Sequence, residues 1–292
     1  MSVVRNLSSI RHEEKAVEQT RQITNAMYLL STSRMKKAMQ MIEYNQMYMR
    51  RIRAAVKDIL RMSGTIHHHY VEESGSRAAY LVISADKSMC GAYNFNVTDL
   101  AVSSMKKHSL KPYIVNVGIC GGDMLKAKGF EADMDWLGAS QQPSLYYARQ
   151  IADHLISLYD SDEIGEIYAV YTRYINSAVQ KAECIKLLPL SMEIFDDVNI
   201  EYDYQAQPIY EPSPIEVFNT MVPQYCIGMV YGMLSHASAS EHAARMSSMQ
   251  SATHNADSMI DELKFEYNTA RQSAITAEIT EIASAVEIFT KD

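Results

Sequence analysis

The chain has 292 residues, of which 47% are hydrophobic and 21% charged, a composition that fits a folded protein and excludes a disordered one. It holds no apolar run long enough to cross a bilayer and no N-terminal apolar segment with a cleavage site, so we expect neither a transmembrane helix nor a signal peptide. The four cysteines have no metal-binding or paired spacing, which favours free thiols and predicts neither a zinc site nor disulfides.

The N-terminal segment, residues 1–62, has no Gly or Pro from about Ser9 to Met62 and is predicted to be one long helix, roughly 80 Å in length at ~1.5 Å per residue. Its apolar positions alternate in steps of three and four residues, the spacing of a coiled-coil seam. The seam comprises Met35, Ala38, Ile42, Asn45, Met49, Ile52, Val56 and Ile59, continued upstream by Ile10, Val17, Thr24, Met27 and Ser31. A polar residue at one seam position, here Asn45, typically fixes the register of the pairing. The opposite face is basic and carries Arg34, Lys36, Lys37, Arg50, Arg51, Arg53, Lys57 and Arg61.

A polar linker is expected at 63–76. Ser63-Gly64 ends the helix, and His67, His68 and His69 follow it. Three adjacent histidines are able to bind a metal, but no second cluster of ligands follows them. A solvated loop is therefore the preferred interpretation, and no metal site is predicted.

The segment 77–195 alternates short β-branched apolar runs with helical patterns and predicts a small, mostly parallel, Rossmann-like α/β domain. Strands are expected at 78–84, 113–118, 164–174 and 184–190, and helices at 95–108, 123–128 and 144–159. The glycine motifs that bind nucleotides are missing, and Cys120-Gly121-Gly122-Asp123 offers only a two-glycine turn. Cys90 has no nearby His. We therefore expect no catalytic residues and no cofactor.

An acidic, proline-containing extended connection is expected at 196–214, followed by a C-terminal helix over 215–292 that Pro223 should kink or break locally. From Ser235 to Phe289 the sequence holds no Gly or Pro, and a second seam is predicted there. It comprises Met249, Ala252, Ala256, Met259, Leu263, Tyr267, Ala270 and Ala274, and resumes after one slip at Ile279, Ile282, Val286 and Phe289.

Charge favours pairing of the two ends of the chain. Residues 1–62 carry 12 Lys and Arg against 5 Asp and Glu, whereas residues 235–292 carry 4 against 9. A basic helix and an acidic helix joined through a folded insert would run antiparallel. The predicted architecture is therefore a long antiparallel coiled coil of the N- and C-terminal helices that carries the inserted α/β domain.

Six short motifs give the whole chain a resemblance to a known family. They are Thr20-Arg-Gln-Ile-Thr24-Asn-Ala-Met27; Arg34-Met35-Lys36-Lys37-Ala38; Cys90-Gly91 with Asn94; Glu241-His-Ala-Ala-Arg245-Met246; Ala252-Thr-His-Asn255-Ala256 with Met259-Ile260; and Tyr267-Asn268 through Arg271-Gln272, Ile275-Thr276 and Glu278-Ile279 to Glu281-Ile282. The sequence resembles the gamma subunit of the F-type ATP synthase, most specifically in the last motif. Ser88 and Ala92 depart from it, because the family usually has glycines there, and this places the geometry of that turn in question.

The resemblance implies a non-catalytic central rotor shaft that couples ion-driven rotation of a membrane ring to ATP synthesis or hydrolysis at beta-subunit sites. It implies alpha, beta and epsilon subunits and the c-subunit ring as partners, no nucleic acid, no direct membrane insertion, and a place on the cytoplasmic face of a bacterial membrane. By residue matching, Arg271, Gln272 and Thr276 would contact a beta-subunit loop, and Arg34, Met35 and Lys37 would face the beta-subunit lever.

Two other classes stay open on the sequence alone. An α/β enzyme or binding domain carried on a coiled-coil dimer would self-associate through its seams. The basic N-terminal helix would suit a nucleic acid, but its predicted partner helix is acidic and its basic face has no interleaved aromatic residues.

Overall fold

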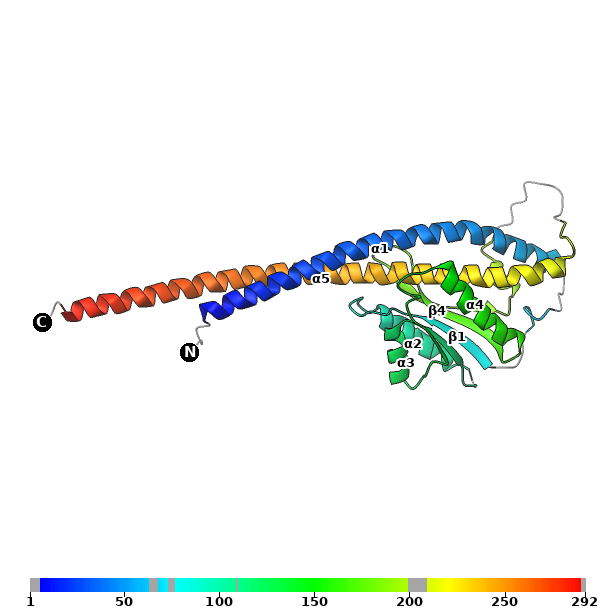
Figure 1. Cartoon of the computed structure of the whole chain (residues 1–292), viewed down its shortest axis with the longest axis horizontal. Helices are drawn as coiled ribbons and strands as arrows, with labels where there is room; N and C mark the ends of the chain where they lie inside the picture. The colour runs from blue at the N-terminus through cyan, green and yellow to red at the C-terminus, as the bar shows by residue number, and fades with distance from the viewer. Residues whose placement is uncertain (1–5, 63–67, 73–76, 109, 199–208, 290–292) are drawn as a thin grey trace. The chain divides into compact units, whose positions relative to one another are not determined.

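The computed structural model (Figure 1) describes residues 6–62, 68–72, 77–108, 110–198 and 209–289. The chain forms two compact units. The coiled-coil unit comprises Met1–Leu30 and Met246–Asp292, and the α/β unit comprises Ser31–Arg245. Two long helices, α1 (Leu7–Met62) and α5 (Pro214–Phe289), contribute to both units.

The two long helices begin and end close to the predicted positions, but the predicted break at Pro223 is absent. Pro223 lies inside α5, which is uninterrupted from Pro214 to Phe289. On either side of it, Phe218, Val222 and Tyr225 are fully buried in the core of the α/β unit. Burial of this helix face outweighs the roughly 3 kcal/mol that a proline costs in a helix interior.

The α/β unit contains one five-stranded sheet in the order β3-β2-β1-β4-β5. The strands are β1 (Arg77–Ile83), β2 (Tyr113–Val117), β3 (Met134–Trp136), β4 (Ile164–Tyr174) and β5 (Gln180–Leu188). The first four are parallel and β5 is antiparallel to β4, which confirms the mostly parallel sheet. Strand β3 was not predicted, because three residues are too few to establish a period of two.

Helices cover both faces of this sheet, as Figure 1 shows. Helices α2 (Tyr93–Met105) and α3 (Ile119–Ala127) pack on the face formed by Ala78, Tyr80 and Val82. Helix α4 (Leu145–Asp160) and the α/β-unit portions of α1 and α5 pack on the opposite face, which includes Leu81 and Ile83. Alternate residues of β1 therefore serve two cores, as a strand buried on both sides requires.

The two adjacent glycines lie inside α3, although its start was predicted at residue 123. A Cβ at Gly121 would lie 2.2 Å from the Ser84 Oγ, and the Gly121 N–H donates to that oxygen at 3.0 Å. These contacts show why glycine is needed there: it lets α3 approach the end of β1. The backbone N–H that could hold a phosphate is already bonded to Ser84.

Asn45 makes the contact across the helix pair that its seam position predicts. In the α/β unit its Nδ2 donates to the Gly228 carbonyl oxygen of α5 at 3.0 Å. Gly228 and Gly232 bring the two backbones close, since a Cβ at Gly232 would lie 2.6 Å from the Asn45 Nδ2. This hydrogen bond specifies one antiparallel register in the α/β unit.

Two cations of the predicted basic face are engaged in structural contacts. The Arg53 guanidinium donates to both Asp197 carboxylate oxygens, at 2.6 and 2.9 Å, and to the Ile194 carbonyl oxygen at 2.7 Å. The Lys57 ammonium donates at 2.8 Å to the carbonyl oxygens of Phe195 and Val198. These bonds hold the short 3₁₀ helix η1 (Met192–Phe195) against α1.

The two histidines that the structure describes lie in a loop, as predicted: His69 is exposed and His68 is partly buried, and both are also hydrogen-bonded. The His68 ring lies 2.6 Å from the Asn219 Oδ1 of α5, and the His69 ring lies 3.1 Å from the Tyr159 carbonyl oxygen of α4. His67 and most of the linker 63–76 fall outside the described residues, as does much of the connection 196–214. Among described residues, no group of His, Cys, Asp and Glu could hold a metal ion.

A buried ion pair links α5 to the turn that follows β1. The Arg245 Nη1 lies 2.6 Å from the Glu241 Oε1, and both side chains are less than a tenth exposed. The Arg245 Nη2 also donates to the carbonyl oxygens of Lys87 and Ser88, at 3.2 Å each.

In the turn after β1, the residues with a left-handed backbone are Met89 and Gly91. Ser88 and Ala92, which stand where the family usually has glycines, lie at positions that do not require glycine. Ala92 has a φ of −84°, and Ser88 has no positive φ.

In the coiled-coil unit the two helices run antiparallel. The Thr253 hydroxyl of α5 donates to the Thr24 Oγ1 of α1 at 2.8 Å, and the Arg11 guanidinium lies 4.9 Å from the centre of the Tyr267 ring. Met249, Ala256 and Leu263 are buried as predicted. Ile260 takes the buried position expected for Met259, which is 46% exposed.

The seam does not continue to Phe289 as predicted. Arg11 pairs with Tyr267, and four positions further along each helix α1 reaches its first residue, Leu7, while α5 reaches Arg271. Every side chain described from 271 to 286 is exposed, including Ile279 at 61% and Ile282 at 66%. The helical part of α1 is too short to cover this part of α5.

We predict that replacing Asn45 by Ala lowers the free energy of unfolding by about 1 kcal/mol, because one hydrogen bond across the helix pair is lost. Urea denaturation of the full chain measures this. Gln46→Ala is the control, since Gln46 is exposed on the same helix and should change stability by less than about 0.5 kcal/mol. Equal effects of the two substitutions would contradict a role of Asn45 in the pairing.

Replacing Arg245 by Met should cost roughly 3–5 kcal/mol in the same measurement, because it leaves the Glu241 carboxylate buried without a counter-charge. Adding Glu241→Met to that variant should recover part of the loss, since no buried charge then remains. If the double variant were as unstable as the sum of the two single variants, the pair would not be energetically coupled.

Candidate functional site

The six predicted contact residues lie on two surfaces, one in each compact unit. Arg34, Met35 and Lys37 belong to α1 in the α/β unit. Arg271, Gln272 and Thr276 belong to α5 in the coiled-coil unit. The two surfaces are therefore described separately.

On α1, the three predicted residues face different surroundings. Arg34 and Lys37 are exposed, and neither has a hydrogen bond or ion pair with another described residue. Met35 is only 7% exposed, and its sulfur lies 4.0 Å from the Tyr174 hydroxyl. Met35 thus packs beneath the surface, and the two cations are the groups that a partner can reach.

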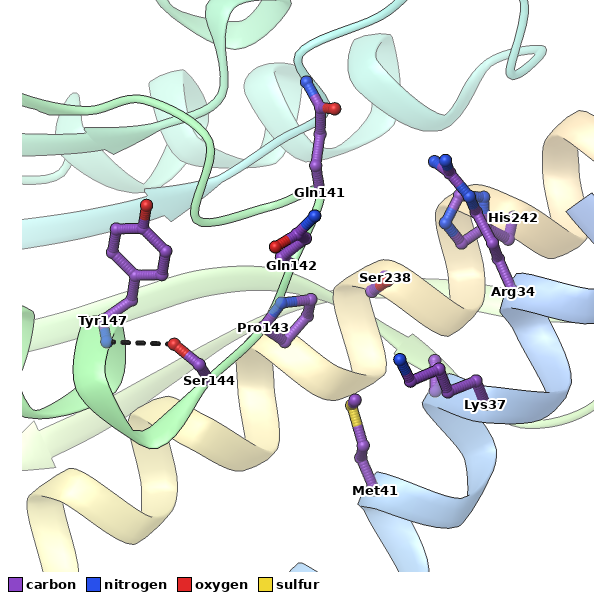
Figure 2. A pocket seen from close by; sticks show the side chains of 11 residues that line it. Arg34, Lys37, Met41, Gln141, Gln142, Pro143, Ser144, Tyr147, Ser238 and His242 are labelled. Atoms are coloured by element: carbon purple, nitrogen blue, oxygen red, sulfur yellow. Dashed lines mark hydrogen bonds between the residues drawn. The ribbon is translucent and has the colours of Figure 1, made fainter.

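A cavity of about 490 Å³ lies beside these cations, within the α/β unit (Figure 2). It is formed by α1, by α5 and by the loop that leads into α4. Its lining residues are Arg34, Lys37, Ala38, Met41, Gln141, Gln142, Pro143, Ser144, Tyr147, Ser238 and His242. The sequence did not reveal this cavity, because its lining comes from three segments that are distant in the chain and meet only in the folded protein.

At the cavity wall and behind it, three buried groups of α5 interact electrostatically: His242, Glu241 and Arg245. Burial, together with the nearby positive charges of Arg245 and Arg34, lowers the pKa of His242 to about 4, so this imidazole is neutral at physiological pH. Burial also raises the pKa of Glu241, while its ion pair with Arg245 opposes the rise. Glu241 and Arg245 belong to one of the matched motifs and stand four residues apart, but their burial follows only from the tertiary fold.

On α5, the residues from Arg271 onward form a second surface of different character. Ile275, Ile279 and Ile282 are 42%, 61% and 66% exposed and recur at steps of four and three residues. That spacing places them on one face of the helix. Arg271 lies at the start of this surface, where pairing with α1 ends.

The hydroxyl groups of this segment are bonded within their own helix. Each donates to the carbonyl oxygen four residues earlier, at 2.8 to 3.0 Å: Thr269, Ser273, Thr276, Thr280 and Ser284. Thr276, a predicted contact residue, is therefore no free hydrogen-bond donor. It presents its methyl group and its oxygen lone pairs to a partner.

The thiols show no sign of reactivity. All four cysteines are free, and burial raises the pKa of Cys90 to about 11 and that of Cys226 to about 12. The Cys90 sulfur accepts a hydrogen bond from the Asn94 Nδ2 at 3.4 Å. Protonated thiols of this kind are poor nucleophiles.

In the part of the chain that the structure describes, no helix is long and apolar enough to cross a membrane.

Comparison with known proteins covers nearly the whole chain. Residues 6–288 match the family described as ATP synthase. The ATP synthase gamma chain of Caldanaerobacter subterraneus is 37% identical over 288 residues, which cover 94% of this chain and 97% of that protein. The gamma chain of Ruminiclostridium cellulolyticum is 34% identical, and the match covers 97% of this chain and 99% of that one.

Solved structures have the same fold. A chain of the Euglena gracilis mitochondrial ATP synthase rotor aligns with a TM-score of 0.63 at 18% identity, covering 92% of this chain and 98% of that one. A chain from the central stalk and c-ring of the Tetrahymena thermophila enzyme aligns with a TM-score of 0.59 at 20% identity, covering 79% and 99%. With this sequence similarity over almost the full length, the chain belongs to the ATP synthase gamma chain family and is a non-catalytic subunit of that complex.

Proposed function

We propose that this chain is the rotating shaft that carries ion-driven rotation of a membrane ring to the beta-subunit sites, where ATP is made or hydrolysed. One observation carries the proposal: α5 continues beyond the start of α1 as a helix with an exposed apolar face. Exposed large apolar residues in a helical row mark a surface that a partner covers. A ring of subunits around the helix would cover it from every side.

The contacts with beta subunits are assigned to the two surfaces described above. Arg271, Gln272 and Thr276 would meet a beta-subunit loop where α5 becomes a single helix. Arg34 and Lys37 would face the beta-subunit lever, and Met35 supports them from below. Exposed charges of this kind contribute little affinity, about 0–1 kcal/mol each, and act mainly on orientation and encounter rate. Weak contacts suit a subunit that must release each partner in turn.

The remaining partners would be the alpha subunits of the same ring, the epsilon subunit and the c-subunit ring. The chain would be peripheral to the bacterial membrane, on its cytoplasmic face.

If instead it were an α/β enzyme on a coiled-coil dimer, the purified chain would self-associate and turn over a nucleotide by itself. ATPase activity found only after reconstitution with alpha and beta subunits supports the shaft and excludes that enzyme.

Replacing Arg271 and Gln272 together by Ala should lower coupled ATP synthesis in inverted membrane vesicles, because both side chains would lose their beta-subunit contacts. The matched control is Lys264→Ala with Gln250→Ala. It also removes one cation and one amide, from exposed positions in the paired part of α5. Coupling that is unchanged, or that falls equally in the control, would refute the assignment of these two residues.

Replacing Ile279 and Ile282 together by Asn should leave the urea midpoint of the isolated chain unchanged, because both side chains are already more than half exposed. The same change should reduce co-purification with alpha and beta subunits. Leu263→Asn, at a buried seam position that is 6% exposed, should instead lower the midpoint of the isolated chain. Normal assembly of the double variant would contradict the proposal that alpha and beta subunits cover the apolar face of α5.

A further inference from the structure

The cavity beside Arg34 and Lys37 has an excess of positive charge. Its lining residues include these two cations and no acidic side chain. Neither cation has a hydrogen bond or ion pair with another described residue. Figure 2 shows Arg34 beside His242, with Lys37 extending from the next turn of α1 toward the same space. Two unpaired cations beside one cavity favour an anionic occupant.

Neutral side chains of the cavity wall offer hydrogen-bond donors as well. Ser238 is only 4% exposed, yet its hydroxyl has no hydrogen bond with any described residue. Its neighbours on α5 do have partners: the Ser235 hydroxyl donates to the Tyr231 carbonyl oxygen and the Ser240 hydroxyl to the Thr172 carbonyl oxygen. The Ser238 oxygen is not among the described buried polar atoms that are sealed without a partner, so it faces the cavity, where an occupant can accept its hydrogen bond.

The tautomer of His242 provides a further donor. Its Nδ1 lies 3.4 Å from the Arg245 Nη1, and a guanidinium only donates, so this Nδ1 accepts. A neutral imidazole that accepts through Nδ1 carries its hydrogen on Nε2. His242 is 4% exposed and lines the cavity, and no described residue accepts from its Nε2.

The third wall is the beginning of a long helix. Ser144 is the N-cap of α4, a 16-residue helix, and its hydroxyl accepts from the Tyr147 N–H at 3.4 Å. The first turn of such a helix carries a partial positive charge and stabilises anions. The side-chain amides of Gln141 and Gln142, in the loop before it, add donors that adjust to the shape of a ligand.

We propose that this cavity is a binding site for a small, doubly charged oxyanion of the phosphate class. Arg34 and Lys37 would balance its two charges, and Ser238 and His242 would donate to its oxygens from the buried side. A monovalent carboxylate would leave one of these cations unbalanced. The proposed rotor function concerns contacts with other subunits. This site is separate from it, because a small anion would bind in a cavity within the α/β unit.

The test is calorimetric titration of the full-length chain with inorganic phosphate at constant ionic strength. We expect saturable binding at one site. Lys37→Gln should weaken it about tenfold or more, because a charge-assisted hydrogen bond is lost. Lys36→Gln is the matched control: it removes the same charge from the adjacent exposed residue, which does not line the cavity, and should change the affinity less than twofold.

Ser238→Ala separates this site from the partner contact proposed for Arg34 and Lys37, since it alters no exposed charge. It should also weaken phosphate binding while leaving coupled ATP synthesis unchanged. Gln141→Ala, on the exposed loop, is a second variant that does not threaten folding and should weaken binding as well. Each variant is compared with the parent chain by urea midpoint.

Three results would overturn the proposal. The first is the lack of saturable phosphate binding by the parent chain. The second is equal weakening by Lys36→Gln and Lys37→Gln, which would mean diffuse attraction to a basic helix. The third is displacement of phosphate by an equal concentration of an acidic peptide, which would assign the cavity to a partner's carboxylate side chains.

Discussion

The antiparallel register of α1 against α5 is the constraint on which the rest of the structure depends. In the α/β unit it is set by the hydrogen bond from Asn45 to Gly228, and in the coiled-coil unit by that from Thr253 to Thr24. Once the register is fixed, the position at which α1 begins, at Leu7, decides how much of α5 is left unpaired. Arg271 marks that position, so the register determines which residues of α5 are available to other subunits.

The α/β unit depends on the same helix pair. α5 provides one layer of its core through Phe218, Val222 and Tyr225, and a buried ion pair on α5 holds the turn after β1. The sheet therefore folds against part of the helix pair and is no independent module attached to it. This explains why a proline is accommodated within α5: the helix is stabilised there by tertiary packing and not by local propensity.

Much of the fold could be predicted from the sequence, because helix and strand periodicity and the scarcity of Gly and Pro are local signals. The seam positions of α1 are a clear case: Val56 and Ile59 are fully buried as expected. A local pattern in α5 does not show how far the helix that pairs with it, α1, extends. Ile279 continues the seam pattern of Leu263, yet Leu263 is buried and Ile279 is exposed, because α1 begins too late to reach it. The cavity was missed for a similar reason, since Lys37, Gln141 and Ser238 meet only through the tertiary fold.

The hydroxyl groups of α5 from Thr269 to Ser284 have a consequence for motion. Their hydrogens are committed to carbonyl oxygens one turn back in the same helix. A surrounding surface that moves past them meets threonine methyl groups, serine methylene groups and oxygen lone pairs, but no free hydroxyl hydrogen. In the proposed role these hydroxyl groups would add no donors to the contact, so Arg271 and Gln272 would be the side chains between 269 and 284 that donate hydrogen bonds to a partner.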